Sequence, residues 1–591
     1  MAIDGILLGR GVISKDDLDR ARAEQRASGE RIDRVITRLG LAPRETILAA
    51  IGEQLHLPVV DLSSLSVDPS VLSLLPSRLV FKQHCVPISR TGAGASGRGG
   101  TLTIATSNPY DLSVVDELRL ITGCSIELAL ADEQELHKFI RANYGVGGDT
   151  LDAMAAEAKP LAATEKPGDD EMAQAQEASV VRLVNDILTE AVAERATDVH
   201  IEPYEQELIV RYRIDGVLQR ANVPATINRF ASAVVSRLKI MANLNIAEKR
   251  KPQDGRITFK TRPAPGRPAE EFDLRVSVIP MLFGEGVVLR VLSKTAVLLP
   301  LQELGMPEWI LARWRQLIDR PHGILLVTGP TGSGKSTTLY ASLNRIVTDE
   351  IKVITVEDPV EYHVAGVNQI QVNHKVGLDF AAGLRSILRH DPDVVMIGEI
   401  RDKETAETAV QASLTGHLVF STLHTNDAAG ATTRLLDMGV EPFLVSSSVE
   451  GVLAQRLVRR ICRECRESYE PHAGDLPDDF VLAPTDRAEG EQAAGEQAAG
   501  AQVAGVGAGV LYRGKGCRNC RNTGYRGRLG IYELLSMTDA LREMIMHRGS
   551  AHAIAAHASR SGDLRRMRED GYAKALAGST TMHEVTQALA G

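Results

Sequence analysis

The sequence lacks three features that would indicate a membrane, an exported or a nucleic-acid-coating protein. No apolar run approaches the about 20 residues that a membrane-spanning helix needs. The N-terminus, MAIDGILLGRGVISKDD, has no basic segment ahead of a sustained apolar core, so we expect no signal peptide and a cytosolic protein. A net charge of -9 argues against a globally basic body that coats nucleic acid. Any membrane contact is therefore expected to go through a partner.

Cysteine is also scarce, with 6 in 591 residues, which excludes a disulfide scaffold. Four of them form two CxxC pairs, Cys462 with Cys465 and Cys517 with Cys520. In a reducing compartment such pairs favour a metal, because each offers two thiolates in a tight turn and four thiolates complete the shell of a structural zinc. The alternative is a pair of redox disulfides. Four thiolates leave no open position, so no chemistry is expected at the zinc.

The N-terminal region contains an internal repeat. Residues Ile6–Gln25 align without gaps on Val35–Gln54, and each copy predicts a helix, a glycine turn, a capping residue and a second helix. Strand-like runs follow at Thr101–Thr106 and Ser125–Leu130. The whole chain is too long for one hydrophobic core, so we expect about three or four domains.

Two stretches are poor in large apolar residues. The segment from Gly145 to about Gln176 is rich in Ala, Gly, Pro and acidic residues, which predicts a flexible linker. Residues Ala488–Gly509 repeat EQAAG between the two CxxC pairs, and we expect a solvated insertion there because loop closure costs little more as a loop lengthens. After the linker, a helix and short alternating strands predict an α+β domain; these strands are Leu208–Asp215, Phe272–Ile279 and Gly286–Leu292.

One short motif predicts a nucleotide site. GPTGSGKS fits GxxxxGK[ST] in full, follows the apolar run Ile324–Val327 and precedes a good helix former, STTLYASLNRI. The glycines let backbone N–H groups converge on phosphate oxygens. Lys335 places a cation at the β- and γ-phosphates, and the Ser336 hydroxyl can bind Mg²⁺. The residues expected to contact the nucleotide are Gly329, Pro330, Thr331, Gly332, Ser333, Gly334, Lys335, Ser336 and Thr337.

Three further apolar strands end in polar residues. KVITV leads into Glu357, DVVMI leads into Glu399, and HLVFSTL leads into His424. Ligands bind at the carboxyl ends of the strands in an open parallel sheet, so we expect these side chains around one phosphate. A carboxylate there can hold Mg²⁺ or polarise the attacking water, and a histidine can sense the γ-phosphate. For any one of them alone, a surface or capping role is the alternative.

Together these motifs resemble the secretion ATPases, the hexameric motors of type II secretion and type IV pilus systems. ITVEDPVEY resembles the Asp box of that family, DVVMIGEIRD its atypical Walker B motif and GHLVFSTLHTNDA its His box. Three segments resemble the family's second N-terminal domain: Ala196–Pro203, Val210–Leu218 and Ala247–Ile257. The resemblance covers about Ser179 to the C-terminus and, more weakly, the first 145 residues.

The resemblance implies a multidomain α/β fold. A RecA-like P-loop ATPase core is preceded by an α+β, PAS-like domain and a small N-terminal domain, and carries a tetracysteine zinc subdomain and a helical C-terminus. The expected parts are an N-terminal docking domain 1–144, a linker 145–178, the second N-terminal domain 179–297, the ATPase core 298–456, the zinc subdomain 457–530 with its insertion 488–509, and the C-terminal helical region 531–591.

The resemblance also implies residue roles. Lys335 and Ser336 bind ATP and Mg²⁺, while Glu357 and Glu399 are the acidic groups at the metal and the attacking water. Which glutamate is the base stays open. His424, together with His417, is expected to read the γ-phosphate. In this family arginines of the middle domain reach the nucleotide; the candidates are Arg211, Arg237, Arg250 and, as the expected contacts, Arg213 and Arg256.

The implied function is a cytoplasmic homohexameric ATPase that powers type II secretion across the outer membrane by assembling a pseudopilus. The alternative is a type IV pilus assembly ATPase. The retraction branch generally lacks both the tetracysteine insertion and a long N-terminal region. The expected partners are an inner-membrane platform protein and a cytoplasmic anchor protein, which would hold the motor at the inner-membrane face.

Two other classes of function remain as alternatives. A hexameric nucleic-acid motor would show basic or aromatic pore loops, and the acidic balance and the 4% of aromatic residues count against it. A non-hydrolysing nucleotide switch would not need both Glu357 and Glu399.

The N-terminal repeat resembles a domain that binds a cyclic dinucleotide in some members of the family. The binding form carries Arg-Leu-Gly ahead of each helix. This chain has Arg31-Ile32-Asp33 in the second copy, and Ala2-Ile3-Asp4 aligns with it in the first. Asp33 would place a negative charge where a phosphate approaches. We therefore expect docking rather than dinucleotide binding.

Overall fold

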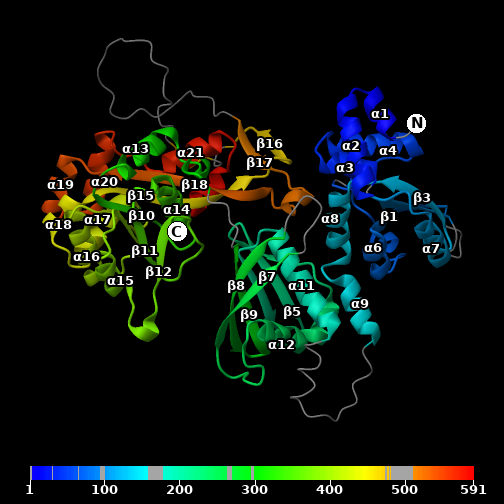
Figure 1. Cartoon of the computed structure of the whole chain (residues 1–591), viewed down its shortest axis with the longest axis horizontal. Helices are drawn as coiled ribbons and strands as arrows, with labels where there is room; N and C mark the ends of the chain where they lie inside the picture. Colours follow the sequence, from blue (N-terminus) through cyan, green and yellow to red (C-terminus); the bar gives the residue numbers. More distant parts are fainter. Residues whose placement is uncertain are drawn as a thin grey trace. The chain divides into compact units, whose positions relative to one another are not determined.

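The computed structural model describes residues 3–29, 31–63, 65–92, 100–157, 177–261, 269–293, 299–472, 476–477, 480 and 510–590. The chain forms two compact units, Met1–Thr295 and Ala296–Gly591, each of which is described by itself (Figure 1). The insertion expected at 488–509 lies outside the described residues. Among the helices that are described, none combines the length and the apolarity needed to cross a bilayer.

The N-terminal repeat folds as two helix–turn–helix copies. These are α1 (Ile3–Gly9) with α2 (Lys15–Ser28), and α3 (Ile32–Arg38) with α4 (Arg44–Leu55). The turns contain Gly11 and Gly40 at φ 65 and 66, a left-handed conformation that suits glycine. Equivalent positions are buried in one shared core, as Leu7 and Ile36 show with 0% exposure each. The predicted repeat is thereby confirmed.

A small three-stranded sheet follows, in the order β1-β2-β3. Its strands are β1 (Cys85–Thr91), β2 (Thr101–Thr106) and β3 (Ser125–Leu130), of which the last two are the predicted runs. The helices of this part are α5 (Pro69–Leu72), α6 (Ser77–Gln83), α7 (Leu112–Thr122) and α8 (Glu133–Tyr144).

The segment expected to be a flexible linker begins with a helix. Helix α9 (Gly148–Glu157) buries Leu151 and Met154 in the core of the following α+β domain. The expectation is wrong for these residues, because two apolar side chains one helical turn apart in an Ala-rich segment give a face that can pack. Residues 158–176 of the expected linker lie outside the described residues.

The α+β domain is an antiparallel sheet in the order β6-β5-β4-β9-β8-β7. Alternate side chains of β5 are buried, and helices α11 and α12 share the core on that face. The predicted helix and strands are confirmed. The elements are α11 (Ala178–Ala193), β4 (Asp198–Pro203), β5 (Leu208–Ile214), β6 (Val217–Arg220), η1 (Ala225–Phe230), α12 (Ala231–Met241), β7 (Gln253–Lys260), β8 (Glu271–Met281) and β9 (Gly284–Ser293).

The second unit is built on a seven-stranded sheet in the order β12-β11-β13-β14-β10-β15-β18. Neighbouring strands run parallel except β18, which is antiparallel to β15. The strands are β10 (Gly323–Thr328), β11 (Val353–Glu357), β12 (Val367–Gln371), β13 (Val394–Ile397), β14 (Leu418–Leu423), β15 (Val449–Ile461) and β18 (Tyr525–Ser536). The predicted parallel sheet is confirmed.

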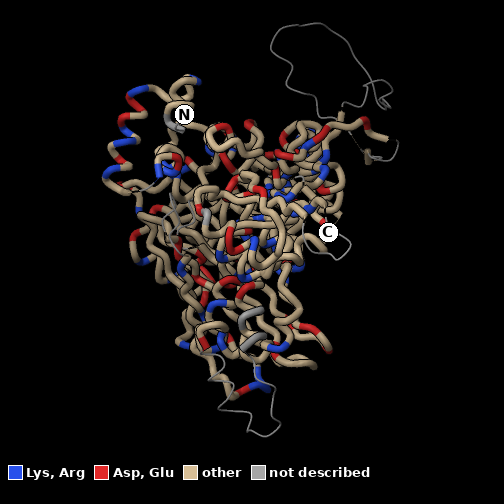
Figure 2. Tube along the Cα trace, turned by 90° about the vertical axis from the view of Figure 1, so that its right-hand side faces the viewer, with Lys and Arg blue, Asp and Glu red and all other residues tan. Residues whose placement is uncertain are grey.

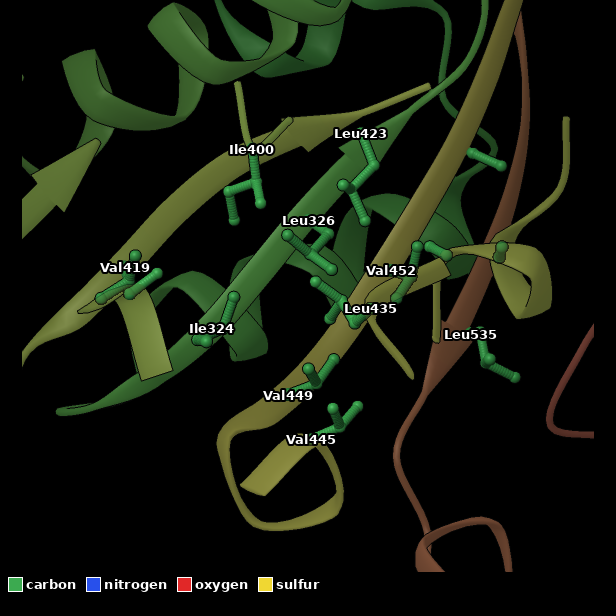
Figure 3. Close-up of a cluster of buried hydrophobic side chains, with 14 of the residues drawn as sticks. Ile324, Leu326, Ile400, Val419, Leu423, Leu435, Val445, Val449, Val452 and Leu535 are labelled. Carbon is green, nitrogen blue, oxygen red and sulfur yellow. The ribbon is translucent and has the colours of Figure 1, made fainter. Parts of the chain in front are cut away.

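Both faces of this sheet are covered, which explains its continuous apolar strands. Ile324 and Leu326 of β10 belong to one core, drawn in Figure 3, while Leu325 and Val327 belong to the other. Helices α13 (Glu308–Ile318) and α14 (Lys335–Ile346) contribute to the second core. Those of the first are α15 (Phe380–Ile387), α16 (Lys403–Leu414), α17 (Ala428–Asp437), α18 (Pro442–Ser448), α19 (Asp539–Met546), α20 (Ala551–Arg560) and the start of α21 (Met567–Leu576).

The cysteine-bearing segment is an extension of this sheet. The ladder between β15 and β18 runs from the pair Gly451 and Ser536 to the pair Ile461 and Tyr525. The boundaries expected after 456 and 530 therefore fall inside two paired strands. The small sheet of β16 (Arg466–Tyr469) and β17 (Leu511–Gly514) lies between them in sequence, and α22 (Met582–Ala590) ends the described chain.

Candidate functional site

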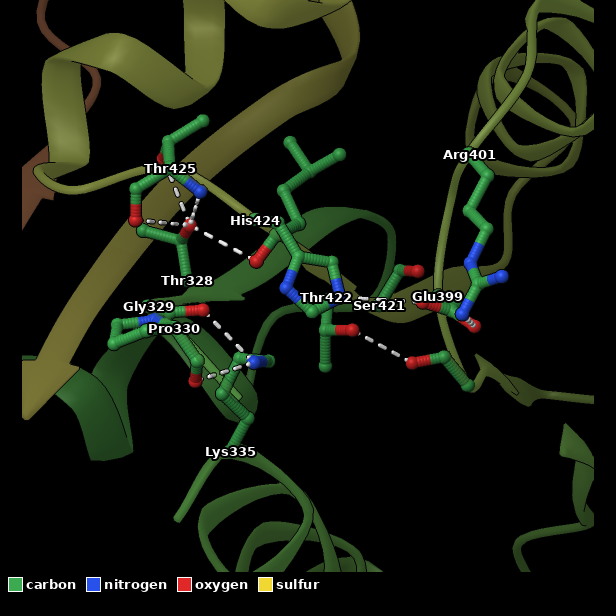
Figure 4. A network of polar contacts seen from close by, with 12 residues as sticks. Thr328, Gly329, Pro330, Lys335, Glu399, Arg401, Ser421, Thr422, His424 and Thr425 are labelled. Carbon is green, nitrogen blue, oxygen red and sulfur yellow. Dashed lines mark hydrogen bonds and ion pairs between the residues drawn. The ribbon is translucent and has the colours of Figure 1, made fainter. Parts of the chain in front are cut away.

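The phosphate loop connects β10 to α14 as the motif predicts. Gly329, Gly332 and Gly334 have φ of 146, 80 and 90, values that side chains with a Cβ rarely adopt. The Lys335 ammonium donates to the carbonyls of Gly329 at 2.8 Å and Pro330 at 3.0 Å (Figure 4). Gly334 caps α14 without a side chain, so the amino end of that helix faces the loop. A loop of this shape, with a helix N-terminus behind it, suits a phosphate.

Glu399, two residues beyond the end of β13, lies beside basic side chains. Its carboxylate pairs with Arg401 at 2.6 Å and lies 3.2 Å from His424 Nε2. Burial lowers the pKa of Lys335, and the charge of Glu399 acts in the opposite direction, which brings the two groups into one electrostatic environment. Thr422 donates to the Gly398 carbonyl at 2.7 Å and fastens the end of β14 to that of β13. The strand ends therefore bring Lys335, Glu399 and His424 together.

His417 lies at the other edge of the sheet. It precedes β14, and its carbonyl accepts from the N–H of Gly323 at the start of β10, whereas His424 follows β14. A strand of 6 residues separates the two histidines, or about 20 Å of extended chain. The expectation that His417 reads the γ-phosphate is therefore wrong.

Glu357, the last residue of β11, has neutral partners. It is 4% exposed, and its carboxylate accepts from Tyr340, from Thr355 at 2.7 Å and from Gln369 at 3.0 Å. The two glutamates thus differ in environment: one is held by neutral donors, and the other lies beside basic side chains.

Sequence reasoning missed Gln455, which belongs to β15. Its side chain is 1% exposed, donates to the Ser333 carbonyl at 2.7 Å and accepts from the Thr338 hydroxyl at 2.7 Å. It therefore ties the phosphate loop to the sheet and to α14. The one available signal was a Gln-Arg pair inside the apolar run of β15. The neighbouring Arg456 donates to Asn426 of the His box at 3.0 Å.

Arg213 and Arg256 lie in the first unit, on a row of charged residues that crosses the sheet. Register pairs Arg256 with Arg275, Arg275 with Arg290, Arg290 with Asp198, and Asp198 with Arg213. A pocket of about 440 Å³ is lined by all of these except Arg213. Asp198 forms an ion pair with Arg290 at 3.4 Å. Arg256, Arg275 and Arg290 lie on neighbouring strands, where like charges repel, so that end of the row suits an anion.

Two of the other arginine candidates have carboxylate partners, as does Arg213, which lies 3.6 Å from Asp198. Arg211 pairs with Glu202 at 2.5 Å, and Arg250 pairs with Glu248 at 2.9 Å. Basic and acidic positions are interspersed along the described trace in Figure 2.

The four cysteines of the CxxC pairs converge in one place. Their sulfur atoms all lie within 4.8 Å of one another, with Cys462 to Cys517 and Cys465 to Cys520 both at 3.8 Å. A disulfide would need about 2.05 Å, whereas four thiolates about 2.3 Å from a zinc ion are about 3.8 Å apart. The geometry fits a closed tetrahedral zinc site, with Cys520 also accepting from the backbone N–H of Cys517 at 3.1 Å.

In the N-terminal repeat, Arg31 has partners within its own domain. Its guanidinium pairs with Asp33 at 2.7 Å, donates to Asn108 at 2.5 Å and stacks over the Tyr110 ring at 4.0 Å. The carboxylate that departs from the Arg-Leu-Gly pattern thus neutralises the arginine of that pattern.

Comparisons with known proteins match most of the chain. A family profile described as type II/IV secretion system protein matches residues 173–587, and one described as MshEN domain matches residues 55–150. The chain is 41% identical over 584 residues to the type IV pilus assembly ATPase PilB of Myxococcus xanthus, covering 98% of this chain and 97% of the relative. It is 42% identical over 585 residues to the type II secretion system protein E of Xanthomonas campestris pv. campestris, covering 98% and 96%. It is 48% identical over 501 residues to the type II secretion system protein E of Pseudomonas aeruginosa, covering 82% and 91%.

Proposed function

Since this chain belongs to the type II/IV secretion system protein family and is an ATP-hydrolysing enzyme, we propose that it is the motor of type II protein secretion. As a cytoplasmic homohexamer it would assemble a pseudopilus that moves proteins across the outer membrane. The observation that carries the proposal is the convergence of Lys335, Glu399 and His424 at the carboxyl ends of parallel strands. Its cofactors are ATP with Mg²⁺ and, at the four cysteines, Zn²⁺.

Each residue of the candidate site would have a separate role in binding or hydrolysing the nucleotide. The phosphate loop binds the triphosphate through its backbone N–H groups, and Lys335 contacts the β- and γ-phosphates. The Ser336 hydroxyl would hold Mg²⁺, which neutralises charge on the phosphates. His424 would report whether the γ-phosphate is present. Hydrolysis then changes the contacts of this edge of the sheet, and such a change can move one domain relative to another.

The two glutamates would have different tasks. Glu399 shares the electrostatic environment of Lys335, whereas hydroxyl and amide donors fix the orientation of the Glu357 carboxylate. This contrast supports Glu399, beside Arg401 and His424, as the group on the Mg²⁺ side. It supports Glu357 as the group that orients the attacking water.

Arg213 and Arg256 would supply positive charge to a nucleotide from the α+β domain. The row of arginines across that sheet supports this assignment, because it leaves an anion-sized pocket beside Arg256. The first 144 residues would dock the motor to a cytoplasmic anchor protein, and the ATPase would act on an inner-membrane platform protein. Membrane contact would go through these partners.

The enzymatic test compares purified wild type with Lys335→Ala, Glu357→Gln and Glu399→Gln. We expect each substitution to lower kcat for ATP hydrolysis by about 100-fold or more, because each removes a charge that acts on the transition state. Lys403→Ala is the control, since that exposed lysine pairs with Glu407 on a helix surface. Equal rates for Lys335→Ala and wild type would contradict the enzyme assignment. Hydrolysis that depends on added DNA would favour a nucleic-acid motor.

The cellular test replaces Lys335 by Ala in the host and measures exported enzymes in the medium together with pili on the cell surface. Loss of the exported enzymes with pili retained supports type II secretion. Loss of pili with an unchanged medium would make the chain a type IV pilus assembly ATPase, the second candidate that the 41% identical relative favours. The Lys403→Ala strain should match the wild type in both assays.

A further inference from the structure

Tyr340 connects the phosphate-loop helix to the Asp box. It lies on α14, is 1% exposed, and donates its hydroxyl hydrogen to the Glu357 carboxylate. The same hydroxyl accepts the backbone N–H of Glu361 at 3.3 Å. One hydroxyl thus contacts both the strand end and the loop that follows it.

The ring of Tyr340 is fixed as firmly as its hydroxyl. The Tyr362 ring packs edge-on against it with centroids 4.5 Å apart. Thr337, one turn before Tyr340 on the same helix, lies beside Tyr362 and opposes the effect of burial, which raises the pKa of Tyr362. The first two turns of α14 therefore hold the segment from Glu357 to Tyr362.

The three donors to Glu357 come from three elements. Thr355 belongs to its own strand, and Gln369 belongs to the edge strand β12. Tyr340 is, among the described donors, the one from the helix that begins with Lys335 and Ser336. Among these three described donors, Tyr340 is therefore the one that relates the position of this carboxylate to the loop that binds the phosphates.

Tyr340 acts as a donor over the whole working range of pH. Burial, and then the negative charge of Glu357, raise the pKa of Tyr340 above its ordinary value. The titratable groups that face it are Glu357, Glu361 and Tyr362. The hydroxyl keeps its proton and can offer it to the carboxylate.

We propose that Tyr340 is a positioning residue for ATP hydrolysis, which holds the Glu357 carboxylate in register with the phosphate loop. The proposal rests on the role of Glu357 given under the proposed function. Loss of the hydroxyl would free the carboxylate to rotate, so that fewer bound ATP molecules have a correctly oriented water. Binding of ATP itself would be left intact, because the described hydrogen bonds of the Tyr340 hydroxyl go to Glu357 and Glu361 and not to the loop.

The test compares Tyr340→Phe with Tyr532→Phe in the full-length protein. Phenylalanine keeps the ring and removes only the hydroxyl. For Tyr340→Phe we expect kcat to fall about 10-fold or more with KM for ATP within about twofold, which is the size of one hydrogen bond to a charged group. Tyr532 is the matched control: it is 2% exposed in the same unit and donates to the Leu304 carbonyl at 2.8 Å. Its substitution should lower the thermal midpoint and leave kcat within about twofold.

A double substitution separates positioning from stability. If Tyr340 acts through Glu357, then Tyr340→Phe adds no further loss of kcat in a Glu357→Gln background. An additive loss, or an unchanged kcat in Tyr340→Phe while Glu357→Gln is impaired, would overturn the role of Tyr340 alone. Wild-type activity in Glu357→Gln would instead overturn the assignment of Glu357, and the proposal for Tyr340 with it.

Discussion

Replacing Gln455 by alanine should weaken ATP binding, because Gln455 on β15 holds the phosphate loop through a hydrogen bond to Ser333. The amide makes two buried hydrogen bonds of 2.7 Å, one to the Ser333 carbonyl and one to the Thr338 hydroxyl. Without it both partners are left unpaired in a site where Gln455 is 1% exposed. Each unpaired buried group costs about 1–3 kcal/mol, so we expect a loss of about 2–6 kcal/mol in the stability of this unit.

Part of that loss should appear in nucleotide affinity. In the variant, the phosphate loop of the free protein is less ordered than in the wild type. ATP binding must then order the loop, which costs free energy that the hydrogen bond to Gln455 avoids in the wild type. A cost of about 1.4 kcal/mol would raise KM for ATP about 10-fold. kcat should change less, because the described hydrogen bonds of the Gln455 side chain go to Ser333 and Thr338 and not to Glu357, Glu399 or His424.

The assay combines steady-state hydrolysis with nucleotide titration and thermal unfolding. Thr338→Val is the matched control, since it removes the bond to the amide oxygen and leaves the tie to Ser333. It should lower the thermal midpoint and leave KM within about twofold. If Gln455→Ala destabilises the protein but binds ATP as tightly as Thr338→Val does, then the tie to Ser333 does not shape the loop and the reasoning is refuted.

Two further predictions concern the zinc site and a buried carboxyl group. Metal analysis of the purified protein should find one zinc per chain. Cys465→Ser should lose the zinc and have a lower thermal midpoint, whereas the control Cys85→Ser should keep the zinc. Zinc retained by Cys465→Ser would contradict the four-thiolate site. Glu533 is 3% exposed and accepts from the N–H groups of Ala428 and Met567, and burial raises its pKa. The folded state therefore holds this proton more tightly than the unfolded state, so its contribution to stability is full below about pH 4.3 and is lost as pH rises through the folded pKa. The difference between the thermal midpoints of wild type and Glu533→Gln should become smaller as the pH is raised from 4 to 8. A difference that does not change with pH would refute the raised pKa of Glu533.

Short-range sequence patterns predicted much of the fold, and they predicted the phosphate loop of the candidate site. The glycine spacing around Lys335 dictates a phosphate loop, because few other residues accept its backbone angles. The apolar strands and their polar ends predicted the parallel sheet, since a strand buried on both faces must be apolar along its length. The equal burial of Leu7 and Ile36 was likewise implied by the repeat.

Some errors came from patterns that do not show where a chain packs. The Ala-rich composition after Gly145 does not reveal that Leu151 and Met154 find a core in the next domain. That packing depends on neighbours that are distant in sequence. The error at His417 was of another kind, because the predicted strand HLVFSTL already placed His417 at the start of the strand and His424 after it.

The sequence alone determined which chemistry this protein carries: a triphosphate loop, acidic and histidine strand ends and four thiolates, because each depends on residue types at fixed local spacing. Only the tertiary structure decided how these groups are held. Gln455 reaches Ser333 across 122 positions, and Tyr340 reaches Glu357 across 17. Such bonds depend on strand order and helix rotation, which no local pattern encodes.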